Sequence, residues 1–286
     1  MLFTAFGLPF MATALAALLL IAVTVGPIST LVSLRGLEFL SEGIIHAVFP
    51  GIVVGYVVAG IPGLYLGSLL AAAIAAAVLT FISRSGVASG PSIAIVLTSA
   101  FGIGVIVVSQ RSDYAGQLQQ LLFGRVFTIS ASELLPLALG LFIALALVAI
   151  TWRRQVYVAF DREGATAAGA RPLTTDLALN GAIALTVVAA SAAVGTLLVL
   201  AVIIIPGAVA RLVGSSLSVG VAIATAFGAF SAWIGLTVAF SLSVSGATHL
   251  PGGAATVLVM VLAYLLAGAM RFGRNVARKR LPARER

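Results

Sequence analysis

The stretch that decides the fold is Ser41-Glu42-Gly43-Ile44-Ile45-His46-Ala47-Val48-Phe49-Pro50-Gly51, which opens an apolar run that continues to about Val58. A run of this length predicts a helix that crosses a membrane. Glu42 and His46 lie four residues apart, so in a helix they share one face, one turn apart. Ionisable side chains inside a membrane segment are costly and usually face a cavity, a partner or a substrate path. This pair is therefore the main chemical clue in the sequence.

The composition is that of a polytopic membrane protein. Of the 286 residues, 61% are hydrophobic and 8% are charged, and the mean hydropathy is +1.20. A soluble domain carries roughly 25% charged residues, so we expect residues 1–286 to form a single transmembrane domain. The sequence contains no cysteine, which excludes disulfides and thiolate metal sites.

Segments of about 20 apolar residues are needed to span a bilayer, and the sequence holds nine candidates. They cover about residues 6–34, 41–59, 64–82, 92–109, 134–151, 177–192, 194–212, 217–244 and 254–269. The count falls to eight if the short segment 177–192 pairs differently with its neighbour. A tight turn is expected at residues 60–63, and a short interfacial or re-entrant piece at residues 121–124. The predicted fold class is an all-α bundle of eight or nine transmembrane helices with a short cytoplasmic coupling helix.

The positions of the basic residues predict the orientation. With nine spans and the basic tail, residues 271–286, in the cytoplasm, every Lys and Arg except Arg111 and Arg125 falls on the cytoplasmic side. We therefore expect a multi-pass protein of the cell membrane, with its N-terminus outside and its C-terminus inside. The positive-inside rule accounts for the net charge of +8 without a nucleic-acid surface, for which the chain has no folded polar face.

Glu42 stands apart from the other acidic residues because a full membrane-length apolar run follows it and a histidine lies one turn away. Asp161, Glu163 and Asp176 are expected in a polar cytoplasmic connection, residues 152–176. Carboxylate and neutral imidazole are ligands for Zn²⁺ and Mn²⁺.

Two ligands are too few for either ion, and a two-fold symmetric dimer would bring two such pairs together. The alternative interpretation is a glutamate at a helix start near the membrane surface and a histidine hydrogen-bonded within the bundle.

Two further stretches have both a functional and a plain interpretation. Pro50 and Gly51 follow His46 by one turn, and a proline there permits a bend. That bend can shape a site or a gate, or only fit neighbouring helices.

The second stretch lies in a segment covering about residues 155–175, where Asp161 is a predicted N-cap, residues 162–168 a short helix and Gly169 its stop. This helix serves either as a docking peg for a soluble partner or as a capped linker.

Sequence features of an enzyme are missing. The Ser and Thr residues have no His–Asp partners for nucleophilic hydrolysis, and no GxxxxGK[ST] motif is present for binding ATP. His249, in a predicted outer loop, is interpreted as a plain surface residue.

The chain resembles the zinc/manganese/iron-type permease subunits of ABC uptake transporters over nearly its whole length. Their second span typically reads leucine–glycine–aspartate–x–x–x–histidine–alanine–x–x–proline–glycine, to which residues 40–51 are closely similar. Further matches in the same order are Leu122-Phe123-Gly124, Phe160-Asp161 with Ala167-Ala168-Gly169-Ala170, residues 193–199, Ile205-Pro206-Gly207-Ala208-Val209-Ala210-Arg211 and Pro251-Gly252-Gly253.

The resemblance implies the function of a permease subunit in an ABC importer. The metal-contacting aspartate and histidine of the family fall on Glu42 and His46. Its ATPase-docking segment falls on residues 160–171, which include Phe160, Asp161, Ala168, Gly169 and Arg171.

The resemblance also implies partners: a second copy of the chain, a cytoplasmic ATPase subunit and an external metal-binding lipoprotein. Mn²⁺ or Zn²⁺ would be transported, with no cofactor bound permanently. Glutamate stands at position 42 where aspartate is usual, which moves the carboxylate outward by about 1.5 Å and leaves the choice of metal open. The rival hypothesis is an ion-coupled secondary transporter or channel in which Glu42 and His46 relay protons.

Overall fold

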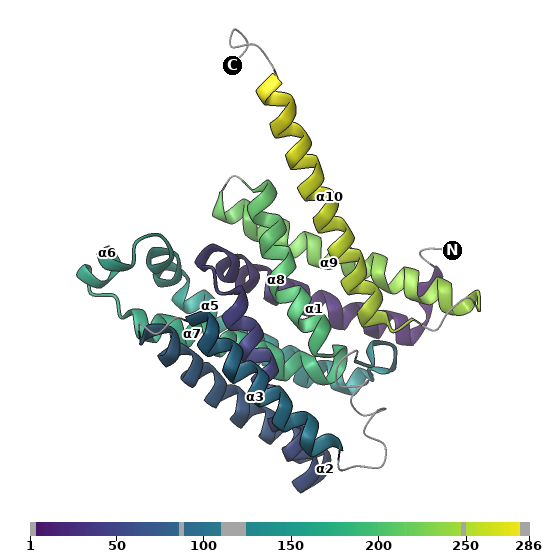
Figure 1. Cartoon of the computed structure of the whole chain (residues 1–286). Coiled ribbons are helices and arrows are strands. Elements are labelled where there is room, and N and C mark those ends of the chain that lie inside the picture. The colour runs from purple at the N-terminus through teal and green to yellow at the C-terminus, as the bar shows by residue number, and fades with distance from the viewer. Residues whose placement is uncertain (1–3, 86–88, 110–123, 215, 247–249, 281–286) are drawn as a thin grey trace.

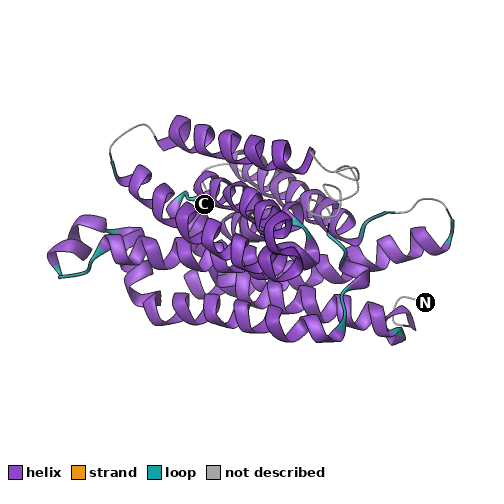
Figure 2. Ribbon diagram, turned by 90° about the horizontal axis from the view of Figure 1, so that it is seen from below, coloured by secondary structure: helices purple, strands orange, loops and turns teal. Residues whose placement is uncertain are grey.

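The computed structural model describes residues 4–85, 89–109, 124–214, 216–246 and 250–280, and every regular element in these ranges is a helix (Figures 1 and 2). The elements are η1 Thr4–Gly7, α1 Pro9–Arg35, α2 Glu38–Arg84, α3 Ser89–Ser109, η2 Val126–Thr128, α5 Ala131–Phe160, α6 Arg162–Ala167, α7 Pro172–Val194, α8 Thr196–Val213, α9 Leu217–Val244 and α10 Gly252–Arg280. Within the described ranges, nine helical segments are long and apolar enough to cross a membrane. The predicted all-α membrane fold is confirmed.

Helix α2 contains two of these spans, which we call its first arm (Glu38–Gly60) and its second arm (Gly63–Arg84). The backbone leaves the helical region at Ala59 and at Gly60, whose φ is +63°. A positive φ of this kind favours glycine, and the predicted turn at residues 60–63 is confirmed. The chain reverses here, so the two arms form a hairpin.

Small residues hold the two arms of α2 in backbone contact. A Cβ atom at Gly55 would overlap the carbonyl group of Gly63, and one at Gly51 would overlap the carbonyl of Gly67 and the methyl of Ala71. In lipid, helices associate through such close van der Waals packing because apolar side chains gain nothing by leaving the hydrocarbon. Glycine at these positions therefore fixes the spacing of the hairpin.

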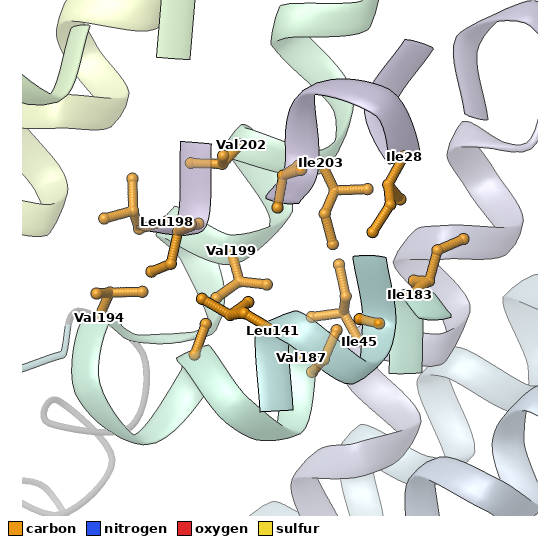
Figure 3. Close-up of a cluster of buried hydrophobic side chains, with 14 of the residues drawn as sticks. Ile28, Ile45, Leu141, Ile183, Val187, Val194, Leu198, Val199, Val202 and Ile203 are labelled. Carbon is orange, nitrogen blue, oxygen red and sulfur yellow. The ribbon is translucent and has the colours of Figure 1, made fainter. Parts of the chain in front are cut away.

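The centre of the bundle is an apolar core formed by α1, α2, α5, α7 and α8. Figure 3 shows part of it, with inward side chains that include Ile28, Ile45, Leu141, Ile183 and Val199. The periphery is formed by α3, which packs against α2, and by α10, which packs against α8 and α9 and extends away from the bundle in Figure 1. The first arm of α2 thus lies between the core and α3.

Helices α5 and α7 are longer toward the polar connection than the sequence indicates. The prediction of a connection over residues 152–176 is wrong at both ends, because α5 continues to Phe160 and α7 begins at Pro172. At 1.5 Å per residue the 30 residues of α5 span about 45 Å, whereas the hydrocarbon core is about 30 Å thick. Helix α5 is therefore longer than the hydrocarbon core, and its C-terminal end leads directly into α6.

Candidate metal site and docking helix

Glu42 and His46 lie one helical turn apart on the first arm of α2, and both are half-buried. The edge of the His46 ring meets Phe101 of α3, with 5.6 Å between ring centroids and 89° between ring planes. The imidazole is thus positioned from two sides, by its own helix and by α3.

The face of α2 that carries this pair continues deeper as an apolar contact with α3. Phe49 and Val53, which follow His46 on the same face, are 1% and 2% exposed. Phe49 packs on Phe101 with 5.4 Å between ring centroids, and a Cβ atom at Gly104 would overlap the Phe49 ring. Helix α3 therefore closes the face beyond His46 and leaves the polar pair at the edge of the closed region.

The described residues supply only two metal ligands at this place. Among them, no group of three or more His, Cys, Asp or Glu side chains is close enough to hold a metal ion. Zn²⁺ takes about four ligands and octahedral Mn²⁺ about six. Glu42 and His46 can therefore provide part of a coordination shell, which water or a second chain must complete.

Pro50 and Gly51 line an apolar groove of about 680 Å³ beside the hairpin, with walls that include Val54, Ala71 and Ala100. Pro50 lies within the helical part of the first arm, and the non-helical residues of α2 are Ala59 and Gly60. Gly51 has a definite packing role, the contact with the second arm. A gating role for Pro50 and Gly51 stays a prediction.

The short helix α6 has the caps that the sequence predicts. The Asp161 carboxylate accepts a hydrogen bond from the Gly164 N–H at 2.8 Å. At the other end Gly169 has φ +82°, and the Ala170 N–H bonds the Ala165 carbonyl at 2.9 Å while the Gly169 N–H bonds that of Thr166 at 3.0 Å. This is the Schellman pattern of helix ends. The cap at Asp161 and the stop at Gly169 are confirmed.

The segment around α6 presents an exposed surface. Phe160, the last residue of α5, is 71% exposed, and Asp161, Ala168, Gly169 and Arg171 are exposed as well. Helix α6 is thus a small unit capped at both ends, and it does not belong to the nine candidate spans of the described residues.

Sequence reasoning missed the role of Asp176, which it placed in a polar loop. The residue lies in α7, is 7% exposed, and its carboxylate accepts hydrogen bonds from Arg35, Arg84 and Arg162. We call these four residues the Asp176 cluster. One signal was available in the sequence, because Pro172 is typical of a helix start and puts Asp176 on the first turns of a helix. Which arginines it meets follows only from the fold.

Comparisons with known proteins identify the family of the chain. The model of the ABC 3 transport family matches residues 7–271 of the chain. The "Manganese transport system membrane protein MntC" of Halalkalibacterium halodurans is 30% identical over 260 residues, which cover 90% of this chain and 86% of that protein. The "Manganese import system permease protein ScaB" of Streptococcus gordonii is 26% identical, and the match covers 92% of this chain and 93% of that protein.

A solved structure, "PsaBC from Streptococcus pneumoniae in complex with Fab", has the same fold, with a TM-score of 0.79 at 22% identity over 93% of this chain and 94% of that one. The chain belongs to the ABC 3 transport family and is a multi-pass membrane permease of an ABC transporter.

Proposed function

We propose that this permease takes up a divalent transition metal, Mn²⁺ in preference to Zn²⁺, and that Glu42 and His46 contact the ion. The observation that carries the proposal is the placement of this half-buried carboxylate–imidazole pair on one face of a membrane-spanning arm. Such a pair is expensive in a membrane unless it meets a substrate. Residues 1–286 would act as one permease domain, with no permanently bound cofactor.

Two arguments favour manganese. The relatives with the names MntC and ScaB are manganese systems by those names. The ligand chemistry agrees, because a carboxylate suits the harder Mn²⁺ and the chain has no cysteine to offer a soft thiolate. The longer side chain of Glu42 would shift the ion relative to the aspartate typical of the family.

A second copy of the chain would complete the site. Two chains about a two-fold axis would contribute two glutamates and two histidines, which removes the shortage of ligands in one chain. The exposed side of α3 and the apolar groove beside Pro50 support such an arrangement, because both leave apolar surface next to the pair.

A separate cytoplasmic ATPase would drive uptake by docking on α6 and the residues around it, with Phe160 as the apolar contact. An external metal-binding lipoprotein would deliver the ion at the opposite side of the cell membrane. This assignment puts the N-terminus outside and the basic tail in the cytoplasm, where α5 projects with its exposed arginines.

Reconstitution in proteoliposomes tests the proposal. The permease and its ATPase are inserted together, and uptake of Mn²⁺ is followed with and without ATP. Uptake is expected only with both ATP and the ATPase, and the double variant Glu42→Ala with His46→Ala is expected to abolish it. Unchanged uptake in the double variant would overturn the site, and uptake by the permease alone would support an ion-coupled transporter instead.

A further inference from the structure

We propose that Asp176 is a positioning residue that ties the docking helix α6 to the C-terminal ends of α1 and α2, of which α2 carries Glu42 and His46. The inference rests on the proposed function for the roles of α6 and of this pair. Its own content is the mechanical link between them, through Arg162, Asp176, Arg35 and Arg84.

The Asp176 cluster joins the ends of three helices to the first turns of a fourth. Arg35 is the last residue of α1, Arg84 the last of α2 and Arg162 the first of α6. Arg35 bonds Asp176 Oδ1, while Arg84 Nη1 and Arg162 Nη2 donate to Oδ2 at 2.8 and 2.6 Å. One carboxylate is therefore the common acceptor for segments that are far apart in the sequence.

Arg35 and Asp176 form the buried part of the cluster, and further hydrogen bonds hold them in place. The side chains of Arg35 and Asp176 are 6% and 9% exposed. Arg35 also donates to Gln155 Oε1 at 2.8 Å, and Gln155 Nε2 donates to the Thr175 carbonyl at 2.8 Å. Removing Asp176 would leave the buried Arg35 without a counter-charge, which is strongly unfavourable. The Arg35–Asp176 pair is thus the permanent anchor.

The outer part of the cluster is different. The Arg162 side chain is 47% exposed, and an ion pair with that much access to water adds little to stability and separates easily. The bundle does not need it, since Arg35 and Arg84 already hold Asp176. What Arg162 does add is a connection to α6, the one element of the cluster that lies outside the membrane spans.

The anchor leads directly to the metal pair. Arg35 is followed by Gly36, with φ +63°, and Leu37, whose N–H bonds the Val32 carbonyl at 2.9 Å. Helix α2 begins at the next residue, Glu38, one turn before Glu42. At its other end, Arg84 closes the second arm. Asp176 therefore bonds the second arm directly through Arg84 and reaches the first arm through Arg35 and the short connection Gly36–Leu37. By this inference a displacement of α6 is passed to both arms.

The test uses Arg162, because replacing Asp176 would leave the buried Arg35 without a counter-charge and destabilise the fold. Permease with Arg162→Gln is reconstituted with the ATPase, and Mn²⁺ uptake is divided by ATP hydrolysed. We expect this ratio to fall several-fold while Mn²⁺ affinity of the permease in detergent stays unchanged. Arg162→Lys keeps the positive charge that the glutamine amide lacks, and it is expected to restore the ratio. Arg154→Gln removes another exposed arginine, on α5, for which the described residues show no ion pair, and it serves as the control. An unchanged ratio in Arg162→Gln would overturn the inference.

A second measurement separates this inference from the proposed function. Because the chain has no cysteine, spin labels can be placed at Phe39→Cys and Thr166→Cys, on the first turn of α2 and on α6. We expect a narrow distance distribution between them, which Arg162→Gln broadens and Arg154→Gln does not. This readout needs neither metal nor ATPase, so it stands even if Mn²⁺ uptake fails. An equally narrow distribution in Arg162→Gln would contradict the link.

Discussion

Thr80 and Asn180, one hundred positions apart in the sequence, are joined by a hydrogen bond of 2.7 Å from Asn180 Nδ2 to Thr80 Oγ1 in the buried interior. Each lies one turn from a member of the Asp176 cluster, Thr80 before Arg84 and Asn180 after Asp176. The second arm of α2 and α7 are thus connected at two successive levels. The Thr80 hydroxyl donates to the Ala76 carbonyl, whereas Asn180 Oδ1 has no partner in the described part of the chain.

This asymmetry predicts that substitutions at Thr80 and Asn180 lower the free energy of unfolding by unequal amounts. Thr80→Val leaves both polar atoms of Asn180 without a partner, so we expect the free energy of unfolding to fall by about 1–3 kcal/mol. Asn180→Leu keeps a similar branched shape and leaves the Thr80 hydroxyl bonded to Ala76, so it should be nearly neutral. Thermal unfolding in detergent measures both, and equal destabilisation by the two variants would contradict the assignment of donors and acceptors.

Glu42 should tolerate a shorter carboxylate but not a neutral side chain. Glu42→Asp keeps the ligand and moves it by about one bond, about 1.5 Å, so Mn²⁺ binding is expected to persist with a changed preference between Mn²⁺ and Zn²⁺. Glu42→Gln keeps the length and loses the charge, and we expect Mn²⁺ affinity to fall by at least about tenfold, or about 1.4 kcal/mol. Isothermal titration with each metal is the measurement. Full Mn²⁺ affinity in Glu42→Gln would remove this residue from the site.

The hairpin contact predicts a steric effect at Gly55. In Gly55→Ala the new methyl group would overlap the Gly63 carbonyl, and such overpacking typically costs about 1–3 kcal/mol. Gly102 of α3 is the matched control, because a Cβ atom there has no neighbour within 4 Å. We expect a lower unfolding temperature in detergent for Gly55→Ala and no decrease for Gly102→Ala. Equal unfolding temperatures would mean that the arms are not in backbone contact.

The cap of α6 predicts a graded loss of ATPase docking. Asp161→Ala removes the acceptor for the Gly164 N–H, which costs about 1 kcal/mol of helix stability, whereas Asp161→Asn keeps an acceptor. We therefore expect less ATPase to copurify with the alanine variant than with the asparagine variant. Since Asp161 is exposed, the membrane bundle itself should unfold as in the wild type. If both variants retain the ATPase equally, the cap has no part in docking.

Local patterns predicted most of the fold, because apolar length, turn residues and caps act over a few neighbouring positions. The spans, the turn at Gly60 and both caps of α6 are of this kind. Asp176 could not be placed in this way, since its environment depends on which helix ends meet. A charged residue beside a polar segment looks the same in sequence whether it faces water or three arginines.

The sequence predicts the two candidate metal ligands but not their surroundings. Glu42 and His46 are adjacent through helix geometry, but the contact of His46 with Phe101 depends on how α3 crosses α2. The expected re-entrant piece at residues 121–124 lies almost wholly outside the described residues, and so does His249. Neither prediction can be compared with the structure.

The backbone contact between the arms of α2 restricts how the metal pair can move. Where carbonyl groups and glycines meet directly, no layer of side chains is left in which one arm can slide along the other. The 47 residues of α2 are therefore expected to tilt as one rigid body. Arg84 then moves whenever His46 does. Opening the site toward either side of the membrane then requires a rigid-body rotation, not the turning of a single side chain.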